Sequence, residues 1–187
     1  MSAPRNAAVI VGSLRKESFN RKIANTLIAM APATLQLTIH EIGQLPLYNQ
    51  DLETAAPPAE WHAFREGIRG ADALLFVTPE YNRGVPGVLK NAIDVASRPL
   101  AHNAWGGKPG GVISVSYGAL GAFGANHALR QSLVAVNVAT MPQPEAYIGQ
   151  AAKLFDDQGQ LTDDSTRAFL QKFLQAFAQW IERNAPK

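Results

Sequence analysis

The polar residues between Gly12 and Asn20 have the types and spacing of a phosphate site. A short apolar run ends at Gly12, and the loop after it leads into an amphipathic helix. In such a unit the backbone N–H groups and the helix N-terminus face the loop and favour an anion. The loop adds three neutral donors and one fixed positive charge: Ser13, Ser18, Asn20 and Arg15. Because a guanidinium can bind phosphate oxygens in bidentate fashion, we interpret this segment as a phosphate-binding loop.

This loop matches neither of two common phosphate motifs. It lacks G-x-x-x-x-G-K-[ST], and no G-x-G-x-x-G follows the first apolar run. The chain has no cysteine, which excludes a thiolate nucleophile and a thiolate metal site, and we expect no metal. The loop would therefore hold a phosphate rather than cleave it. The alternative is an ordinary turn at Gly12-Ser13 followed by an ordinary helix cap at Asn20.

Two further loops of unusual composition each follow a buried apolar run. The second loop carries a proline-bounded set: Pro79, Glu80, Tyr81, Asn82 and Pro86. The prolines stiffen it, Tyr81 offers a flat face and Asn82 an amide. The third loop, 116–122, is glycine-rich, so its backbone can approach a flat ligand closely. A phosphate at one end and a planar, hydrogen-bonding ring at the other indicate a mononucleotide, flavin mononucleotide (FMN) in particular.

Alternating strands and helices must position these loops. The pattern predicts strands at 7–11, 35–42, 73–77, 111–116 and 139–141, and helices ending at 31 and spanning 58–70, 88–97, 123–138 and 163–183. This order predicts the α/β class, with a doubly wound, five-stranded parallel sheet and right-handed crossovers. In the strand order 2-1-3-4-5 the first, third and fourth strands are neighbours. The three loops would then rim one crevice at the carboxyl ends of the strands.

Length and composition limit the alternatives. The 187 residues predict one domain, 1–187, and 47% are apolar while 17% are charged. The net charge of +2 is spread along the chain, which suits a small anionic ligand better than nucleic acid. We find no signal peptide and no apolar span long enough to cross a membrane, and we expect a cytoplasmic protein.

Several residues outside the three loops have simpler interpretations. His40 lies on the polar side of its strand and is expected to be solvated rather than to act as a ligand. In the long segment 43–58, Leu47 and Tyr48 could cover a ligand or pack on the sheet edge, and we weigh these equally. Trp61 is expected in the core. The apolar stripe of the last helix is also expected in the core, and the alternative is that it forms an interface. The stripe consists of Phe169, Leu170, Phe173, Leu174, Phe177, Trp180 and Ile181.

Two segments resemble the signatures of a known family. Gly12–Arg21, and Thr78–Asn82 with Pro86, are similar to those of the NADPH-dependent FMN reductases, particularly the bacterial quinone and chromate reductases. The likeness covers nearly the whole chain, including 89–94 and 129–131. It implies a flavodoxin-like fold, non-covalent FMN, and a homodimer or homotetramer with FMN near the subunit interface.

The resemblance also implies roles for individual residues. The expected phosphate ligands are Ser13, Arg15, Ser18 and Asn20. The expected ring-lining residues are Pro79, Glu80, Tyr81 and Asn82, partly through backbone N–H groups, with Ser116 and Gly118 approaching from the third loop.

The chain departs from the family pattern in places. Gly121-Ala122 stands where relatives tend to have paired glycines. Arg83, at a variable position, could tune access for a nicotinamide phosphate or an anionic acceptor, or be solvated. Arg130 and Glu145 resemble residues that pair across subunits, and the alternative is an ordinary surface salt bridge.

The implied activity is that of an oxidoreductase. NADPH or NADH would give a hydride to flavin N5, and a quinone, azo, chromate or flavin acceptor would take two electrons from the same face in a ping-pong reaction. No catalytic side chain is needed. The main alternative is a flavodoxin-type electron carrier without NAD(P)H activity, and another is a flavin-free interaction protein. Such carriers are usually acidic, so the basic chain and Arg15 favour the reductase.

Overall fold

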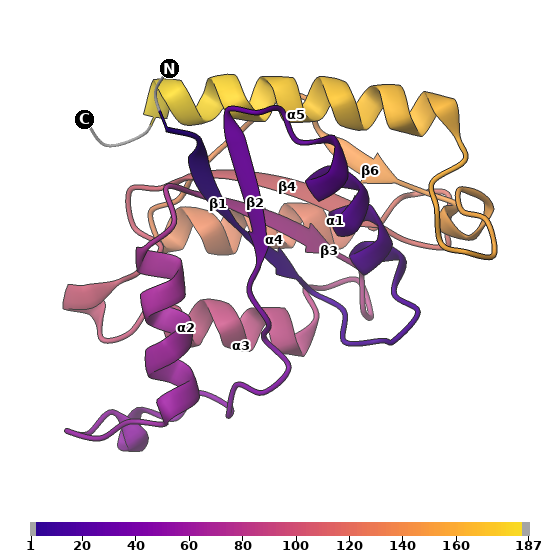
Figure 1. The fold of residues 1–187 in the computed structure, drawn as a ribbon. Coiled ribbons are helices and arrows are strands. Elements are labelled where there is room, and N and C mark those ends of the chain that lie inside the picture. Colours follow the sequence, from indigo (N-terminus) through magenta and orange to yellow (C-terminus); the bar gives the residue numbers. More distant parts are fainter. Residues whose placement is uncertain (1–2, 185–187) are drawn as a thin grey trace.

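The buried apolar runs become neighbouring strands of one parallel sheet (Figure 1). A computed structural model describes residues 3–184. The strands are β1 (Arg5–Val11), β2 (Leu35–Ile39), β3 (Ala73–Thr78), β4 (Pro109–Val115), β5 (Ala139–Thr140) and β6 (Ala146–Ile148). Their order is β2-β1-β3-β4-β5, and β6 also pairs with β4. The predicted α/β class and strand order are confirmed.

The last strand differs from the prediction because it is interrupted. β5 pairs with the start of β4, whereas β6 pairs with its end, at Ile113–Val115. Pro142 and Pro144 lie between the two pieces. Since proline has no N–H to donate to a strand ladder, this segment cannot continue the pairing. Residues 3–184 therefore contain six strands rather than the predicted five.

Helices cover both faces of the sheet (Figure 1). They are α1 (Phe19–Met30), α2 (Ala59–Arg69), α3 (Gly87–Ala96), α4 (Phe123–Ala135) and α5 (Asp164–Asn184). Alternate residues of the central strands point to opposite sides. Val9 and Val11 pack with α1 and α5, whereas Ala8 and Ile10 pack with α2, α3 and α4. This division explains why the central strands read as continuous apolar runs.

The predicted core residues are buried as expected. Trp61 is fully buried, and its indole N–H donates to the Pro46 carbonyl at 2.9 Å. Most of the α5 stripe is buried, while Phe169 and Trp180 at its margins are partly exposed. The stripe therefore forms core within one chain.

His40 is half-buried, so the prediction that it is solvated was wrong. β2 ends before it, at Ile39, and its ring turns onto α2. A Cβ at Gly67 would lie only 2.6 Å from His40 Nδ1, so only glycine leaves room for the ring. Burial lowers the pKa of His40 below its ordinary value.

The register of the sheet brings the three unusual loops to one edge. Val11 lies opposite Val77, and Thr78 lies opposite Ser114. The strand arrows of β1, β3 and β4 consequently end on the same side of the molecule (Figure 1). The predicted convergence of these loops is confirmed.

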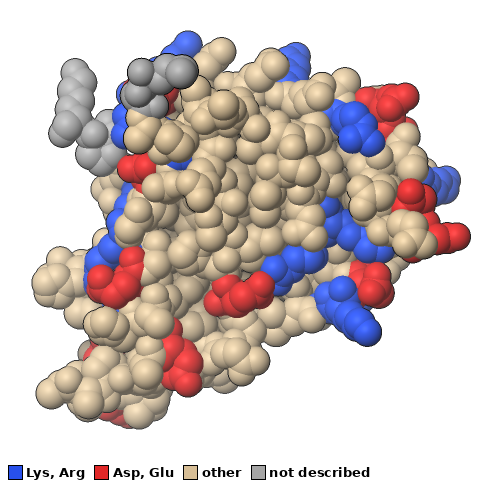
Figure 2. Space-filling model, viewed as in Figure 1, with Lys and Arg blue, Asp and Glu red and all other residues tan. Residues whose placement is uncertain are grey.

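Charged side chains of both signs are interspersed on the face seen in Figure 2, mostly toward its edges. No described helix has the length and apolar character needed to cross a membrane.

Candidate functional site

A cavity of about 100 Å³ lies where the three loops meet. Its lining residues are Ser13, Arg15, Ser18, Phe19, Asn20, Pro79, Glu80, Tyr81, Val115, Ser116 and Tyr117. All the predicted site residues belong to this set except Asn82 and Gly118. The sheet thus brings together residues that lie about a hundred positions apart in the sequence.

The first loop leaves its backbone donors free. The N–H groups of residues 13–20 have no hydrogen-bond acceptor among residues 3–184. The Ser18 hydroxyl caps α1 by accepting from the Arg21 N–H at 3.3 Å, and the first turn of α1 contains no acidic residue. Free N–H groups at a helix N-terminus without a competing carboxylate form a site for an anion.

Gly12 allows this loop to begin close to its neighbours. A Cβ at Gly12 would lie 3.1 Å from both Thr78 Oγ1 and the Leu89 side chain. The Gly12 N–H donates to the Val77 carbonyl at 2.9 Å, which holds the end of β1 against β3. The first and second loops therefore leave the sheet side by side.

Asn20 provides an unsatisfied polar atom inside the cavity. Its Nδ2 lies 3.5 Å from the Val115 carbonyl, and its buried Oδ1 has no partner in the part of the chain that the structure describes. A buried acceptor without a donor is costly in free energy. A ligand that offers a hydroxyl group here would remove that cost.

Arg15 and Tyr117 form one wall of the cavity. Arg15 donates from Nη1 to the Tyr117 hydroxyl at 2.8 Å, and Phe19 meets the Tyr117 ring edge-on with centroids 5.0 Å apart. The bond to Tyr117 raises the pKa of Arg15, so the guanidinium keeps its charge. We did not predict Tyr117 or Phe19 as site residues. Tyr117 directly follows Ser116 at the end of β4, and this position could have revealed it.

The second loop is a tight hairpin. Tyr81 and Gly84 exchange backbone hydrogen bonds of 3.1 and 3.0 Å, and the turn residues Asn82 and Arg83 have φ values of 51° and 64°. Such a two-residue turn with positive φ is typical of a type I′ hairpin. It places Tyr81 at the cavity, whereas the exposed Asn82 lies outside it at the tip.

The Glu80 carboxylate is directed toward α4. Its Oε2 accepts a hydrogen bond of 2.9 Å from the Ala125 N–H, in the first turn of that helix. Arg83 lies 3.5 Å from the other carboxylate oxygen, with a side chain that is 79% exposed. Arg83 is therefore mostly solvated, which agrees with the second of the two roles considered for it in the sequence.

The third loop is held by its own polar contacts. The Ser114 hydroxyl donates to the Gly121 carbonyl at 2.6 Å, and Ser116 donates to the Gly118 carbonyl at 3.2 Å. Gly121 has a φ of 58°, and a Cβ there would lie 2.5 Å from the Tyr147 backbone carbon. Ala122 also has a positive φ, 61°, which is strained for a residue with a Cβ. Gly121-Ala122 is the pair at which the sequence was expected to depart from the family pattern.

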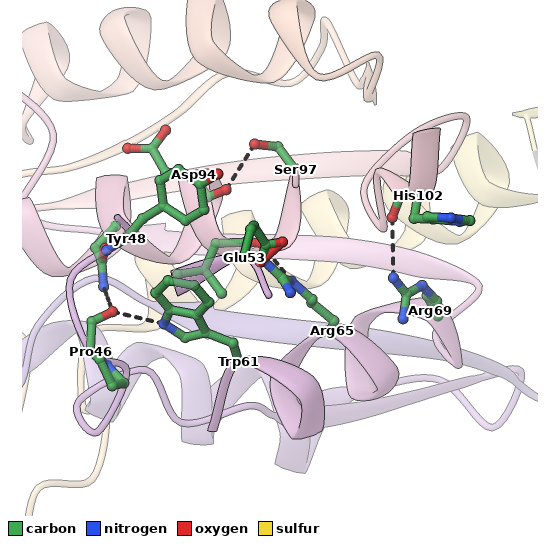
Figure 3. Close-up of polar contacts among 11 residues, drawn as sticks. Pro46, Tyr48, Glu53, Trp61, Arg65, Arg69, Asp94, Ser97 and His102 are labelled. Carbon is green, nitrogen blue, oxygen red and sulfur yellow. Dashed lines mark hydrogen bonds and ion pairs between the residues drawn. The ribbon is translucent and has the colours of Figure 1, made fainter. Parts of the chain in front are cut away.

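The segment 43–58, here called the strap, is anchored to α2 and α3 (Figure 3). Asn91 accepts from the Tyr48 N–H at 2.8 Å and donates to the carbonyls of Leu45 and Pro46. Tyr48 packs on Trp61 with ring centroids 5.3 Å apart, while Leu47 is 79% exposed. Neither side chain lines the cavity, so packing describes Tyr48 better than ligand cover.

A buried ion pair fixes the far part of the strap (Figure 3). Arg65 of α2 lies 2.6 Å from Glu53, and their side chains are 6% and 15% exposed. The Arg65 Nε donates to the Val95 carbonyl at 2.9 Å, and its guanidinium lies 5.4 Å from the Trp61 ring centroid. These contacts join the strap, α2 and α3 into one unit.

Arg130 does not pair with Glu145 within the described chain. It donates to Asn126 Oδ1 and to the Met141 carbonyl, both at 2.9 Å. A pairing of Arg130 with Glu145 across subunits stays a prediction.

A larger cavity, of about 480 Å³, lies away from these loops. It is lined by the start of β1 and β2 and the end of α5, and the Arg5–Glu182 ion pair of 2.9 Å lies within its wall. None of the three loops reaches it, so its size does not connect it with the cavity at the strand ends.

Known proteins resemble this chain over nearly its whole length. A "Quinone reductase" of Pseudomonas putida is 61% identical over 184 residues, which cover 98% of each chain. The solved structure of FerB, a flavoenzyme NAD(P)H:(acceptor) oxidoreductase from Paracoccus denitrificans, is 44% identical with a TM-score of 0.90 and covers 97% of this chain and 100% of its own.

A flavodoxin from Pseudomonas aeruginosa has a TM-score of 0.58 at 20% identity, covers 95% of this chain and 99% of its own, and shares the fold alone. The family model described as NADPH-dependent FMN reductase matches residues 6–153. This match and the full-length relatives show that the chain belongs to the NADPH-dependent FMN reductase family.

Proposed function

We propose that this protein is an FMN-dependent NAD(P)H:quinone reductase whose cofactor binds in the cavity at the strand ends. The observation that carries the proposal is the run of free N–H groups at residues 13–20, which adjoins the tyrosines of the second and third loops. The names of the full-length relatives support the same activity.

The residues present fit the two ends of FMN. At the first loop, Ser13, Ser18 and Arg15 join the free N–H groups in holding the dianionic phosphate. The unsatisfied Oδ1 of Asn20 suits a hydroxyl donor. With its amide oriented as observed, Asn20 would accept from the sugar-alcohol chain of the cofactor rather than donate to the phosphate.

The second and third loops would hold the ring. Pro79, Tyr81 and Ser116 line the cavity beyond the phosphate loop, and Tyr117 adds an aromatic face beside Arg15. Asn82 and Gly118 lie outside the cavity, so their predicted contacts require the ring to extend past the lining residues.

Bound FMN supplies the chemistry, accepting a hydride from NAD(P)H and passing two electrons to the acceptor. The chain supplies binding, orientation and electrostatics. Arg15 and the free N–H groups place positive charge and fixed dipoles beside the cofactor, and dipoles set before the reaction need no reorganisation during it. No side chain of the chain is assigned a proton-transfer step. We further propose that the nicotinamide and the quinone occupy the same open face in turn, the ping-pong order.

The oligomeric state is part of the proposal. The family resemblance implies a homodimer or homotetramer, which light scattering of the purified protein would distinguish. Location in the cytoplasm, and chromate, azo dyes or free flavin as further acceptors, likewise remain predictions.

An anaerobic stopped-flow experiment tests the proposed function. FMN-reconstituted protein is mixed with NADPH and separately with NADH, while the flavin absorption band is followed. The expected result is rapid bleaching with at least one donor, reversed by added benzoquinone. A flavin that stays oxidised with both donors would contradict a reductase and favour the flavodoxin-type carrier.

A further inference from the structure

Helix α4 lacks an N-terminal cap of its own. Its N-cap residue, Ala122, has no side-chain acceptor, and its first turn contains Phe123, Gly124 and Ala125. The first N–H groups of a helix have no partner within the helix and need one elsewhere. Here the Ala125 N–H donates to Glu80 at 2.9 Å, so a residue of the second loop takes the place of the missing cap.

Gly124 makes room for this contact. A Cβ at position 124 would lie 2.9 Å from Glu80 Oε2, closer than such atoms approach in proteins. Any larger residue there would displace the carboxylate from the helix N-terminus. Glycine is otherwise unfavourable inside a helix, so its presence here has a structural reason in Glu80.

The contact joins two parts of the cavity wall. Glu80 begins the hairpin that carries Tyr81, and Tyr81 and Gly84 hold that hairpin together by their backbone bonds. The third loop leads directly into α4, and Ser114 fixes it through the Gly121 carbonyl. The Glu80–Ala125 hydrogen bond therefore links the second loop to the helix that follows the third loop.

We propose that Glu80 is a positioning residue, which holds these two loops at the separation that FMN needs without contacting the flavin through its carboxylate. A carboxylate at a helix N-terminus is also favoured by the helix dipole. The inference rests on the proposed function for the identity of the ligand. The hydrogen bond between Glu80 and Ala125, here called the clamp, is a property of the protein alone.

Two different variants should break the clamp. Glu80→Ala removes the acceptor, and Gly124→Ala leaves Glu80 intact but occupies its place. In the apo protein we expect the Ala125 amide to exchange with solvent roughly tenfold faster in both variants, because its hydrogen bond is lost. Fluorescence titration should show FMN affinity roughly tenfold weaker in both, a size typical of a lost helix cap.

Two control variants separate positioning from other roles. Glu80→Gln keeps an oxygen acceptor and loses the charge, and we expect its FMN affinity to stay within about threefold of wild type. Gly87→Ala places the same methyl group in the first turn of α3, where a Cβ meets nothing within 4 Å. It should change neither amide exchange nor FMN affinity.

Three outcomes would overturn the inference. These are unchanged exchange of the Ala125 amide in Glu80→Ala, wild-type FMN affinity in Gly124→Ala, or a loss in Glu80→Gln as large as in Glu80→Ala. The last would indicate that the charge itself acts on the ligand. If wild-type protein bound no FMN, the proposed function would fail together with the ligand part of the inference, and amide exchange would still decide whether the clamp exists.

Discussion

The first loop, residues 13–20, and the strap are both irregular segments that follow the first two strands, yet the rest of the chain holds them to different extents. In the strap, Trp61 donates to the Pro46 carbonyl and Arg65 pairs with Glu53 (Figure 3). Asn91 accepts from the Tyr48 N–H. In the first loop, the N–H groups of residues 13–20 have no acceptor within the described residues. Almost every backbone donor in a folded protein finds a partner or water. Ser13, Ser18 and Asn20 are buried, so their free N–H groups beside the cavity indicate a ligand site, whereas the contacts of the strap with α2 and α3 indicate a structural role.

The strap should carry stability rather than cofactor affinity. Arg65→Met leaves Glu53 without its buried partner, and the free energy of unfolding should fall by roughly 3 kcal/mol. FMN affinity of the folded protein should stay within about twofold. Urea unfolding and flavin titration measure the two effects. Arg83→Met, which removes an exposed arginine, is the matched control and should cost less than about 0.5 kcal/mol. If Arg65→Met lowered the free energy of unfolding by less than about 1 kcal/mol, the stabilising role of the strap would be contradicted.

Capping residues in the two segments allow a closer comparison. Ser18 caps α1, and Asn49 in the strap accepts from the Asp51 N–H at 3.0 Å. Ser18→Ala should cost about 1 kcal/mol of stability and weaken FMN binding roughly tenfold, because it removes a cap and a hydroxyl donor together. Asn49→Ala should lower stability alone, by at most about 1 kcal/mol. Equal effects of both variants on FMN affinity would contradict the assignment of the phosphate site.

The third loop contains a strained backbone position, Ala122. Ala122 has a φ of 61°, and glycine adopts this conformation without the cost that a Cβ imposes. Ala122→Gly should raise the free energy of unfolding by up to about 1 kcal/mol, measured by urea unfolding. Gly124→Ala in the same helix turn should not stabilise, since its Cβ would contact Glu80. An unchanged or lower stability in Ala122→Gly would contradict the strain.

The smallest expected effect is a pH dependence beside the strap. Burial holds the pKa of His40 below its unfolded value of 6.5, so the unfolded chain binds the proton more readily. Stability should therefore rise with pH through this range and fall below about pH 6.5. His40→Gln should flatten the change between pH 7 and pH 5.

Glu41, close to His40, titrates in a different range. Glu41 and Glu60 line a cavity with His40, and the hydrogen bond from Arg21 lowers the pKa of Glu41 below 4.5. The stability that Glu41 contributes is lost only as the pH falls through that lower value. An undiminished slope between pH 7 and pH 5 in His40→Gln would show that another group is responsible.

Local patterns were enough to predict the sheet and the position of the cavity. Apolar runs ending in glycine, proline or hydroxyl residues identified β1, β3 and β4, and their order brought Ser13, Tyr81 and Ser116 to one cavity. Features that depend on packing between distant segments were missed. The turn of His40 onto Gly67 is one, and the capping of α4 by Glu80 is another.

The pairing of β6 was also missed. This strand has only three residues, and two prolines separate it from β5. The partners of Glu80 and His40 lie more than 25 positions away along the chain, and residue spacing carries no information about such contacts. Tyr117 differs from these, since its place after Ser116 was visible in the sequence.

The most direct test of the phosphate loop compares FMN with riboflavin, which differs only by the phosphate. Both would be titrated into the wild-type apo protein and followed by quenching of flavin fluorescence. If the free N–H groups of residues 13–20 and Arg15 bind the phosphate, FMN should bind at least roughly 100-fold more tightly than riboflavin. Equal affinities would contradict a phosphate site at the end of β1.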